Sequence, residues 1–268
     1  MNTPRIAASS YSNTAPLVWS FLYGRNRAHV ELILDNAPAR SAELLASGRV
    51  DAALVPVITF QTDADLFLVP GVCVGAVENV QSVCLVTRAI DLAAVRSVAL
   101  DVSSKTSVVL TKIIFREFLG LEPEWHDSKP DIPAMLENSD AALIIGDPAL
   151  ALSEPAATMS GFRRFDLANL WHGYTGLGFV FAMWMSRTQK APVDFAAARD
   201  EGLEHLDEIA ANCAGETGLT RDDIKKYLTE NISYTIDDSM RRGMELYFDL
   251  AARHGLIGRN KVLEFASG

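Results

Sequence analysis

Short apolar runs separated by polar turns predict alternating strands and helices in the first third of the chain. Strands are expected at residues 5–8, 30–34 and 51–55, with helices beginning near Pro16 and spanning residues 41–47. Strands that alternate with helices are typical of a parallel sheet with helices on its faces. The first third of the chain is therefore predicted to form one α/β unit.

A second alternation follows and leads into a helical region. Apolar runs predict strands, whereas helical spacing of apolar residues and capping side chains predict helices. The expected strands lie at residues 80–87, 97–100, 124–126, 141–145 and 179–185, and the expected helices at residues 106–119, 132–136, 195–213, 221–231 and 237–254.

This order predicts an α/β protein of two lobes, with the C-terminal helices returning to the first lobe. The chain is expected to cross between the lobes twice, near residues 82–87 and 179–185. Residues 1–85 with 184–268 would form the first lobe, and residues 86–183 the second. A ligand is expected in the cleft between the lobes, facing the carboxyl ends of the strands.

The composition limits the kinds of molecule that the protein is expected to bind. The chain has 268 residues, of which 49% are hydrophobic, and its formal net charge is −10. That apolar content allows a sizeable core, and the absence of a basic run disfavours a nucleic-acid partner. An acidic protein that binds an anion needs local donors, and helix N-termini supply them.

The N-terminal sequence has no apolar segment of signal-peptide length, and residues 176–185 are too few to span a bilayer. We therefore expect a cytoplasmic protein without a membrane partner. The three cysteines have no CxxC spacing, and the five histidines lie far apart, so neither a disulfide framework nor a metal site is expected. No dinucleotide fingerprint, P-loop or hydrolase motif is present, and no cofactor is expected.

Two polar clusters stand between a predicted strand and the helix that follows it. Residues 9–14 include Ser10, Tyr11 and Asn13, and residues 103–107 include Ser104 and Ser107. Such turns can direct backbone N–H groups and hydroxyls into a cleft, although the same residue types also cap helices. The second cluster, at the positive end of a helix, favours a carboxylate site.

Other candidates lie at the ends of the apolar strands. Gly146 permits close approach of the backbone, and Asp147 is either an N-cap or a carboxylate that orients a donor. Gln81 with Ser82, and Thr175 with Gly176, would lie at the hinge and line the floor of the cleft.

Six blocks spread over nearly the whole chain resemble the chorismate dehydratase family of the futalosine route to menaquinone. They occur in the family's order and are fairly specific only together. The blocks are SYSNTAPL (residues 10–17), GRVDAALVP (48–56), SKTSVVLT (104–111), ALIIGDPAL (142–150), WHGYTGLGFVFAMW (171–184) and YLTENISY (227–234).

The resemblance implies a type II periplasmic-binding-protein-like fold and the loss of water from chorismate to give 3-(1-carboxyvinyloxy)benzoate. Asn13 and Ser82 match the family's polar cleft positions, and Thr106 and Ser107 match its Thr-Ser helix start, where a substrate carboxylate is expected. The chain departs from the family at Gly178, where a proline is expected. The full set of expected site residues is Asn13, Ser82 and Asp147 as catalytic positions, and Ser10, Tyr11, Gln81, Ser104, Thr106, Ser107, Gly146, Thr175 and Gly176 as substrate contacts.

The polar clusters contain no histidine, so the identity of the general base is left open between two alternatives. Either the enolpyruvyl carboxylate of chorismate takes the proton while Asn13 and Ser82 orient the substrate, or Asp147 is the base. Three other functions compete: a dehypoxanthine futalosine cyclase, which would need a cleft histidine; a non-catalytic binding protein for small anions; and a LysR-type effector domain. The sequence leaves the oligomeric state open.

Overall fold

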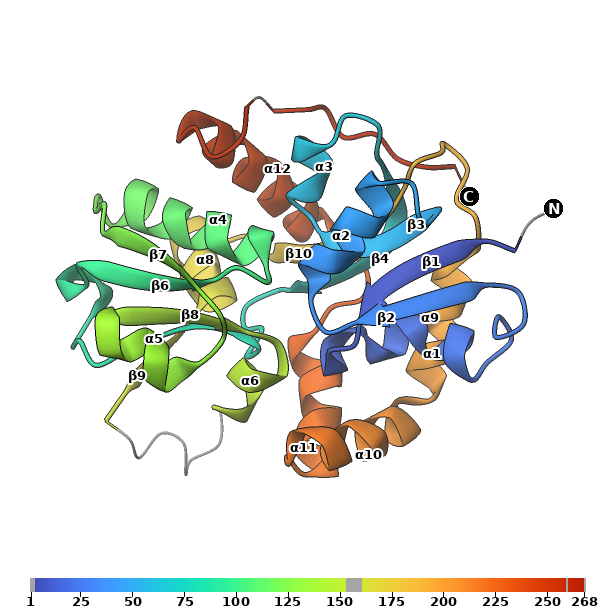
Figure 1. Ribbon diagram of the computed structural model, residues 1–268, viewed down its shortest axis with the longest axis horizontal. Coiled ribbons are helices and arrows are strands. Elements are labelled where there is room, and N and C mark those ends of the chain that lie inside the picture. The colour runs from blue at the N-terminus through green and yellow to red at the C-terminus, as the bar shows by residue number, and fades with distance from the viewer. Residues whose placement is uncertain (1–2, 153–160, 259, 268) are drawn as a thin grey trace.

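Two five-stranded sheets lie side by side, each with helices packed on it, in the computed structural model of the protein (Figure 1). The structure describes residues 3–152, 161–258 and 260–267. The predicted mixed α/β fold is confirmed.

The first sheet has the strand order β2-β1-β3-β10-β4. β1 pairs in parallel with β2 and β3, whereas β10 runs antiparallel to both of its neighbours. Every residue of β3 is buried, as expected for a strand covered on both faces. The strands are Arg5–Ser9 (β1), Glu31–Asp35 (β2), Ala52–Pro56 (β3), Phe67–Ala76 (β4) and Phe179–Ser186 (β10).

The second sheet has the order β7-β6-β8-β5-β9. β6 pairs in parallel with β7 and β8, and β5 runs antiparallel to β8 and β9. β5 and β8 are buried along their whole length. The strands are Val83–Thr87 (β5), Ser97–Asp101 (β6), Glu124–Ser128 (β7), Ala141–Ile145 (β8) and Arg163–Asp166 (β9).

Helices follow the strands in both units. Those of the first unit are η1 (Ser12–Thr14), α1 (Ala15–Leu22), α2 (Pro38–Ala46) and α3 (Thr59–Thr62). Those of the second are η2 (Leu92–Ala94), α4 (Lys105–Ile113), the π-helical turn η3 (Ile114–Phe118), α5 (Ile132–Asn138), α6 (Gly146–Ala151) and α8 (Leu167–Thr175).

The last helices are α9 (Phe195–Glu204), α10 (Leu206–Thr217), α11 (Arg221–Lys226), the π-helical turn η4 (Tyr227–Asn231) and α12 (Asp238–Arg253). One long helix over residues 195–213 was predicted, but the backbone leaves the helical region at His205, and two helices result. α9 packs on α1 in the first unit, whereas α12 contacts both β10 and α4 and so touches both units.

The chain passes between the sheets at residues 77–82 and 176–178, directly before β5 and β10. Each of the two expected crossing strands therefore lies within one sheet. We retain the division into a first lobe (residues 1–85 with 184–268) and a second lobe (residues 86–183) as a proposal. The strand pairing would move both of its boundaries a few residues toward the N-terminus.

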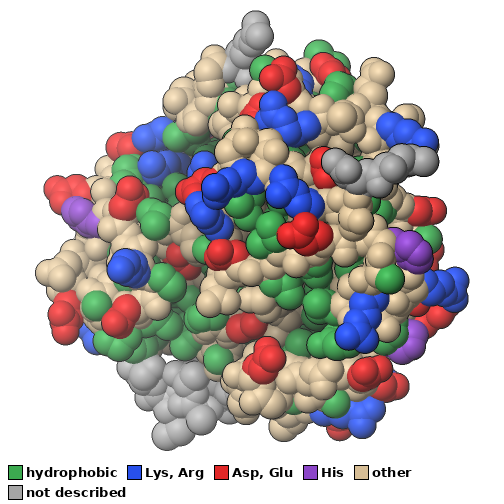
Figure 2. All heavy atoms as spheres, turned by 45° about the vertical axis from the view of Figure 1, so that its right-hand side comes forward, with side chains coloured by type: hydrophobic (Ala, Val, Ile, Leu, Met, Phe, Trp, Pro, Cys, Tyr) green, Lys and Arg blue, Asp and Glu red, His purple; other side chains and the backbone are tan. Residues whose placement is uncertain are grey.

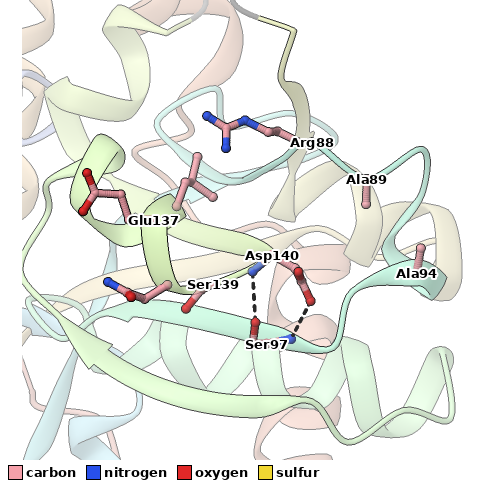
Figure 3. A pocket seen from close by; sticks show the side chains of 9 residues that line it. Arg88, Ala89, Ala94, Ser97, Glu137, Ser139 and Asp140 are labelled. Atoms are coloured by element: carbon pink, nitrogen blue, oxygen red, sulfur yellow. Dashed lines mark hydrogen bonds between the residues drawn. The ribbon is translucent and has the colours of Figure 1, made fainter.

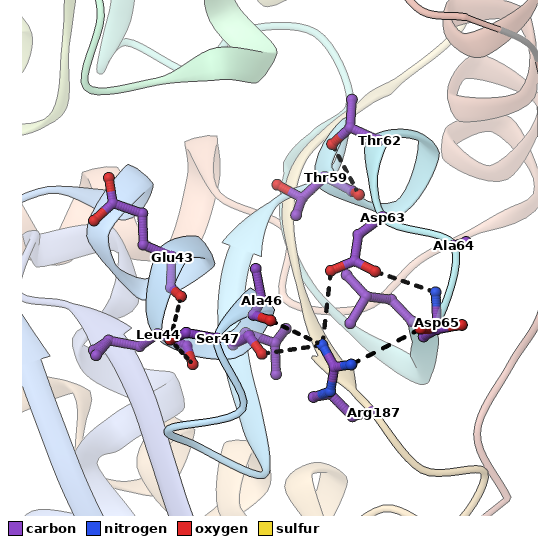
Figure 4. Close-up of polar contacts among 12 residues, drawn as sticks. Glu43, Leu44, Ala46, Ser47, Thr59, Thr62, Asp63, Ala64, Asp65 and Arg187 are labelled. Atoms are coloured by element: carbon purple, nitrogen blue, oxygen red, sulfur yellow. Dashed lines mark hydrogen bonds and ion pairs between the residues drawn. The ribbon is translucent and has the colours of Figure 1, made fainter.

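Arg187 joins three parts of the first lobe just after β10. Its guanidinium donates to the carbonyls of Leu45 and Ala46 at the end of α2, at 3.3 Å each. It also forms ion pairs of 3.9 Å with Asp63 and Asp65 after α3 (Figure 4). A cation at the carbonyl end of a helix is stabilising, so Arg187 holds α2 and α3 against the end of β10.

On the face shown in Figure 2, Lys and Arg side chains lie beside Asp and Glu side chains. In the part of the chain that the structure describes, no helix is long and apolar enough to cross a membrane.

Candidate active site

A cavity lies where the two lobes meet, at the carboxyl ends of β1, β3 and β8, and it has a volume of about 50 Å³. The described residues that line it include no charged side chain. Its polar lining comes from the two predicted clusters: Ser9, Tyr11, Asn13 and Thr14 from the first lobe, and Ser104 and Ser107 from the second. Gly146 of the second lobe also lines the cavity.

The start of α4 presents donors to this cavity. The hydroxyl of Ser104 is the N-cap and accepts from the backbone N–H of Ser107 at 3.4 Å, and the two hydroxyls lie 2.9 Å apart. The positive end of the helix dipole and the unpaired N–H groups of the first turn favour an anion here. Lys105 is exposed and does not line the cavity.

α1 begins on the opposite side of the cavity. The Thr14 hydroxyl donates to the Ser9 carbonyl at 2.6 Å and so ties the turn to the end of β1. Asn13 precedes it, half-buried, and lines the cavity. The cavity therefore lies between two helix starts, one from each lobe, and its donors are neutral.

Asp147 bridges the lobes beside the cavity. Both of its carboxylate oxygens accept from the backbone N–H of Ser12, at 3.1 and 3.2 Å. Burial raises the pKa of Asp147, hydrogen bonds from Ser12 oppose the rise, and the charge of Glu216 adds to it. Asp147 does not line the cavity. It contacts the first lobe across the cleft and does not serve as the N-cap of α6.

Tyr11 and Gly146 are in close contact across the same boundary. Gly146 has φ +66°, and a Cβ at this position would lie 2.7 Å from the Tyr11 ring. Both observations favour glycine at this position. Burial raises the pKa of Tyr11, the neighbouring Ser103 side chain lowers it, and the charges of Asp101 and Asp147 raise it.

Asp101 is a carboxylate at this boundary that the sequence reasoning missed. It ends β6 and is fully buried. One oxygen accepts from the N–H and hydroxyl of Ser103 at 3.0 and 2.6 Å, and the other has no partner among the described residues. Burial raises its pKa. The sequence carried a signal, because Asp101 follows an apolar strand just as the Gly146–Asp147 pair does.

Ser82 is buried behind the cavity at the passage between the lobes. Its carbonyl accepts from the Gly146 N–H at 2.7 Å, and its hydroxyl lies 3.4 Å from the Val80 carbonyl. Gln81 has φ +58°, and its N–H donates to Asp166 at 2.6 Å. Asp166 also caps α8, so one carboxylate fixes the hinge turn and the start of that helix. Neither Gln81 nor Ser82 lines the cavity.

Four other predicted site residues lie away from the cavity lining. Thr106 is buried, and its hydroxyl accepts from the Ile58 N–H at 3.3 Å. Thr175 and Gly176 form the C-terminal end of α8, a helix that was not predicted. The Ser10 hydroxyl is exposed and donates to Asn36 at 3.1 Å. Their roles as substrate contacts stay predictions.

A larger pocket, of about 490 Å³, lies near the amino ends of β6 and β8 (Figure 3). Two of its polar side chains already bond to the backbone, since the Asp140 carboxylate accepts from the Ser97 N–H at 3.1 Å and the Ser97 hydroxyl accepts from the Asp140 N–H at 3.0 Å. Ligands of open α/β sheets bind at the carboxyl ends of the strands. We therefore take the smaller cavity between the lobes as the site. Among the described residues, no group of three or more His, Cys, Asp or Glu side chains could hold a metal ion.

The chain matches a protein family over most of its length. Residues 4–253 match the family model described as menaquinone biosynthesis. The chorismate dehydratase of Thermus thermophilus is 31% identical over 255 residues, which are 88% of this chain and 91% of that protein.

Solved structures show the same fold at low sequence identity. A protein of Archaeoglobus fulgidus superposes with a TM-score of 0.76 at 16% identity, covering 95% of this chain and 98% of that one. The periplasmic aliphatic sulphonate binding protein of Escherichia coli superposes with a TM-score of 0.65 at 18% identity, covering 96% and 89%. The predicted periplasmic-binding-protein-like fold is therefore confirmed.

Proposed function

The chain belongs to the menaquinone-biosynthesis family, and from that premise we propose that it is an enzyme, a chorismate dehydratase of the hydro-lyase class. The observation that carries the proposal is the cavity between the lobes, where two helix starts and neutral side chains converge without a charged residue among the described lining. Helix N-termini hold carboxylates well, and chorismate carries two. The resemblance to the Thermus thermophilus chorismate dehydratase is the reason for proposing chorismate as the substrate.

The reaction depends more on how the substrate is positioned than on a strong acid or base. The C3–H bond breaks, its electron pair forms a ring double bond, and the C4–O bond breaks, so that the hydroxyl leaves as water with the proton. The product is 3-(1-carboxyvinyloxy)benzoate, and aromatisation of the ring drives the step. Holding the substrate in a reactive geometry alone can lower a barrier by about 7 kcal/mol or more.

We propose that the enolpyruvyl carboxylate of the substrate takes the C3 proton. The described lining of the cavity offers no histidine and no carboxylate to do so. Asp147 is the alternative base, but it does not line the cavity, and it bonds instead to the Ser12 N–H. Asn13 and Ser107, on opposite sides of the cavity, would orient the two carboxylates of the substrate.

The competing functions have less support. A cyclase would need a histidine in the cleft as its base, but none of the five histidines of this chain lines the cavity. The likeness to sulphonate binding proteins lies below 25% identity and concerns the fold. We also propose that the enzyme works in the cytoplasm. The described cysteines Cys73, Cys84 and Cys213 are all free and buried, which suits a reducing compartment.

Incubation of purified, chelator-treated protein with chorismate tests the proposal. Chromatography and mass spectrometry should show enzyme-dependent loss of one water and formation of 3-(1-carboxyvinyloxy)benzoate. Unchanged chorismate in the presence of folded protein would reject the proposed reaction and leave the binding-protein function as the better explanation.

A further inference from the structure

The YLTENISY segment, residues 227–234, lies against the passage between the lobes. It contains the π-helical turn η4, and such turns are frequent at functional sites. Ser233 pairs with Gly75 of β4 through hydrogen bonds of 2.8 and 3.0 Å. The Asn231 side chain donates to the carbonyl of Asn79 at 3.4 Å. The segment therefore contacts both the end of β4 and the hinge turn that leads to Ser82.

Tyr227, the first residue of this segment, has a buried hydroxyl close to the site. Tyr227 is 2% exposed, and its hydroxyl has no hydrogen-bond partner among the described residues. Burial raises the pKa of Tyr227, and the side chains of Ser82 and Asn13 are near enough to lower it. The hydroxyl thus lies beside both side chains without completing a bond to either. A buried hydroxyl without a partner is costly, and the place of this one beside Ser82 and Asn13 indicates a role in the site.

We propose that Tyr227 is a positioning residue that sets the orientation of the Asn13 amide. In the substrate complex its hydroxyl donates to the Asn13 side-chain carbonyl and accepts from the Ser82 hydroxyl. This arrangement turns the Asn13 side-chain NH₂ group into the cavity, where it donates to a substrate carboxylate. The proposal rests on the proposed function for its substrate, but it concerns a relation between side chains that can be measured without turnover.

Tyr234, at the other end of the segment, provides a matched control. It is 5% exposed, and its hydroxyl also has no partner among the described residues. Its ionisable neighbours are Tyr227, Cys213 and Cys73. Replacement by phenylalanine removes the same buried hydroxyl at both positions, but only Tyr227 lies beside Asn13 and Ser82.

Kinetics of Tyr227→Phe and Tyr234→Phe with chorismate give the first test. Tyr227→Phe is expected to lower kcat about tenfold, the effect of one lost hydrogen bond, with KM nearly unchanged. Tyr234→Phe should leave kcat within about twofold of wild type on the same reasoning. In an Asn13→Ala background, Tyr227→Phe should have no further effect on kcat, because the amide that it orients is gone.

The side-chain NH₂ resonances of Asn13, assigned by their absence in Asn13→Ala, give a test independent of activity. They should shift in Tyr227→Phe and stay in place in Tyr234→Phe. An unchanged Asn13 resonance in folded Tyr227→Phe would overturn the proposal. So would equal loss of kcat in both variants, or an undiminished Tyr227→Phe effect in the Asn13→Ala background. Wild-type protein that does not consume chorismate would instead reject the proposed function.

Discussion

Asp101 is the last residue of β6 and Asp147 lies two residues after β8, yet their surroundings differ. Asp147 reaches the first lobe and accepts from the Ser12 N–H. Asp101 turns to Ser103 within its own lobe and keeps one oxygen without a partner among the described residues. Sequence reasoning found Asp147 through its Gly-Asp-Pro turn and missed Asp101. The charges of both carboxylates act on Tyr11, which places Asp101 at the same boundary as Asp147.

Asp147→Asn separates the two candidate bases. Asparagine keeps an oxygen that can accept from Ser12, so the contact between the lobes persists. If the substrate carboxylate takes the proton, kcat should stay within about threefold of wild type, whereas loss of a general base typically costs about a hundredfold or more. Steady-state kinetics with chorismate measure the difference. A loss of the larger size in folded protein would assign the proton transfer to Asp147.

Asp101→Asn tests the effect of burial on stability. Burial raises the pKa of Asp101, so the folded protein binds this proton more tightly than the unfolded chain does. The stability that this preference contributes is present below the usual pKa of aspartate and is lost as pH rises through the raised value.

The asparagine variant cannot ionise at this position. Its free energy of unfolding relative to wild type should therefore increase as pH rises from below 3.8, the reference pKa of Asp101, toward neutrality. Denaturant unfolding of both proteins over this range measures the difference. The other carboxylates contribute equally to the pH dependence of both proteins, so their contributions cancel. A difference independent of pH would show that Asp101 has no raised pKa.

At the scale of elements, some strands with continuous apolar runs were predicted well, whereas β4 (Phe67–Ala76) and β9 (Arg163–Asp166) were not predicted. β3 and β8 appear at or within one residue of their predicted ranges, because each carries its own apolar signal. α8 was missed as well. Its N-cap is Asp166, whose carboxylate also accepts from the N–H of Gln81, far away in the sequence. The break at His205 was missed as well, since the residues on both sides are good helix formers.

Gly178, which stands where the related family has proline, makes hydrogen bonds through both its N–H and its carbonyl. Its N–H donates to the Ser239 hydroxyl at 3.1 Å, a bond that proline cannot make. Its carbonyl accepts from the Trp171 indole at 3.2 Å. The turn before β10 is therefore bonded to both α8 and α12.

Gly243 of α12 allows this close approach, and its substitution should be destabilising. A Cβ at Gly243 would lie 2.0 Å from the Gly178 carbonyl oxygen. Overpacking of this kind costs about 1–3 kcal/mol, so Gly243→Ala should lower the free energy of unfolding by that amount.

Gly215 of α10 is the control, since a Cβ there would meet nothing within 4 Å. Gly215→Ala should raise the free energy of unfolding by about 0.4–1 kcal/mol, because alanine restricts the unfolded chain and favours the helix. Chemical denaturation of both variants measures the two values. Similar values for the two substitutions would argue against the close packing of α12 on the turn.

At the scale of the whole molecule, the sequence predicted two α/β units and a cleft at the carboxyl ends of their strands. It could not predict which polar side chains meet across the cleft. Tyr11 meets Gly146, and Ser12 meets Asp147, only because the lobes pack together. Thr106 looked like a substrate contact from its place at a helix start, but its hydroxyl accepts from Ile58 of the other lobe.

We expect the lobes to separate when chorismate binds. The cavity of about 50 Å³ has room for only a few water molecules, and chorismate is a ring with two carboxylates and an enolpyruvyl group. The hydrogen bonds from Ser12 to Asp147 and from Ile58 to Thr106 join the lobes beside the cavity. Opening must break such contacts, and hinge motion at the two passages between the sheets would allow it.

If the reaction takes place between the lobes, one side chain from each lobe should be needed for it. Asn13 lines the cavity from the first lobe and Ser107 from the second, whereas Asn36 is exposed and bonds to Ser10 outside the cavity. The measurement is kcat/KM for chorismate in Asn13→Ala, Ser107→Ala and Asn36→Ala, each shown to be folded. The first two should lose about tenfold or more and Asn36→Ala less than about twofold, as expected for one hydrogen bond to the reacting substrate. Wild-type turnover in both Asn13→Ala and Ser107→Ala would place the reaction elsewhere in the molecule.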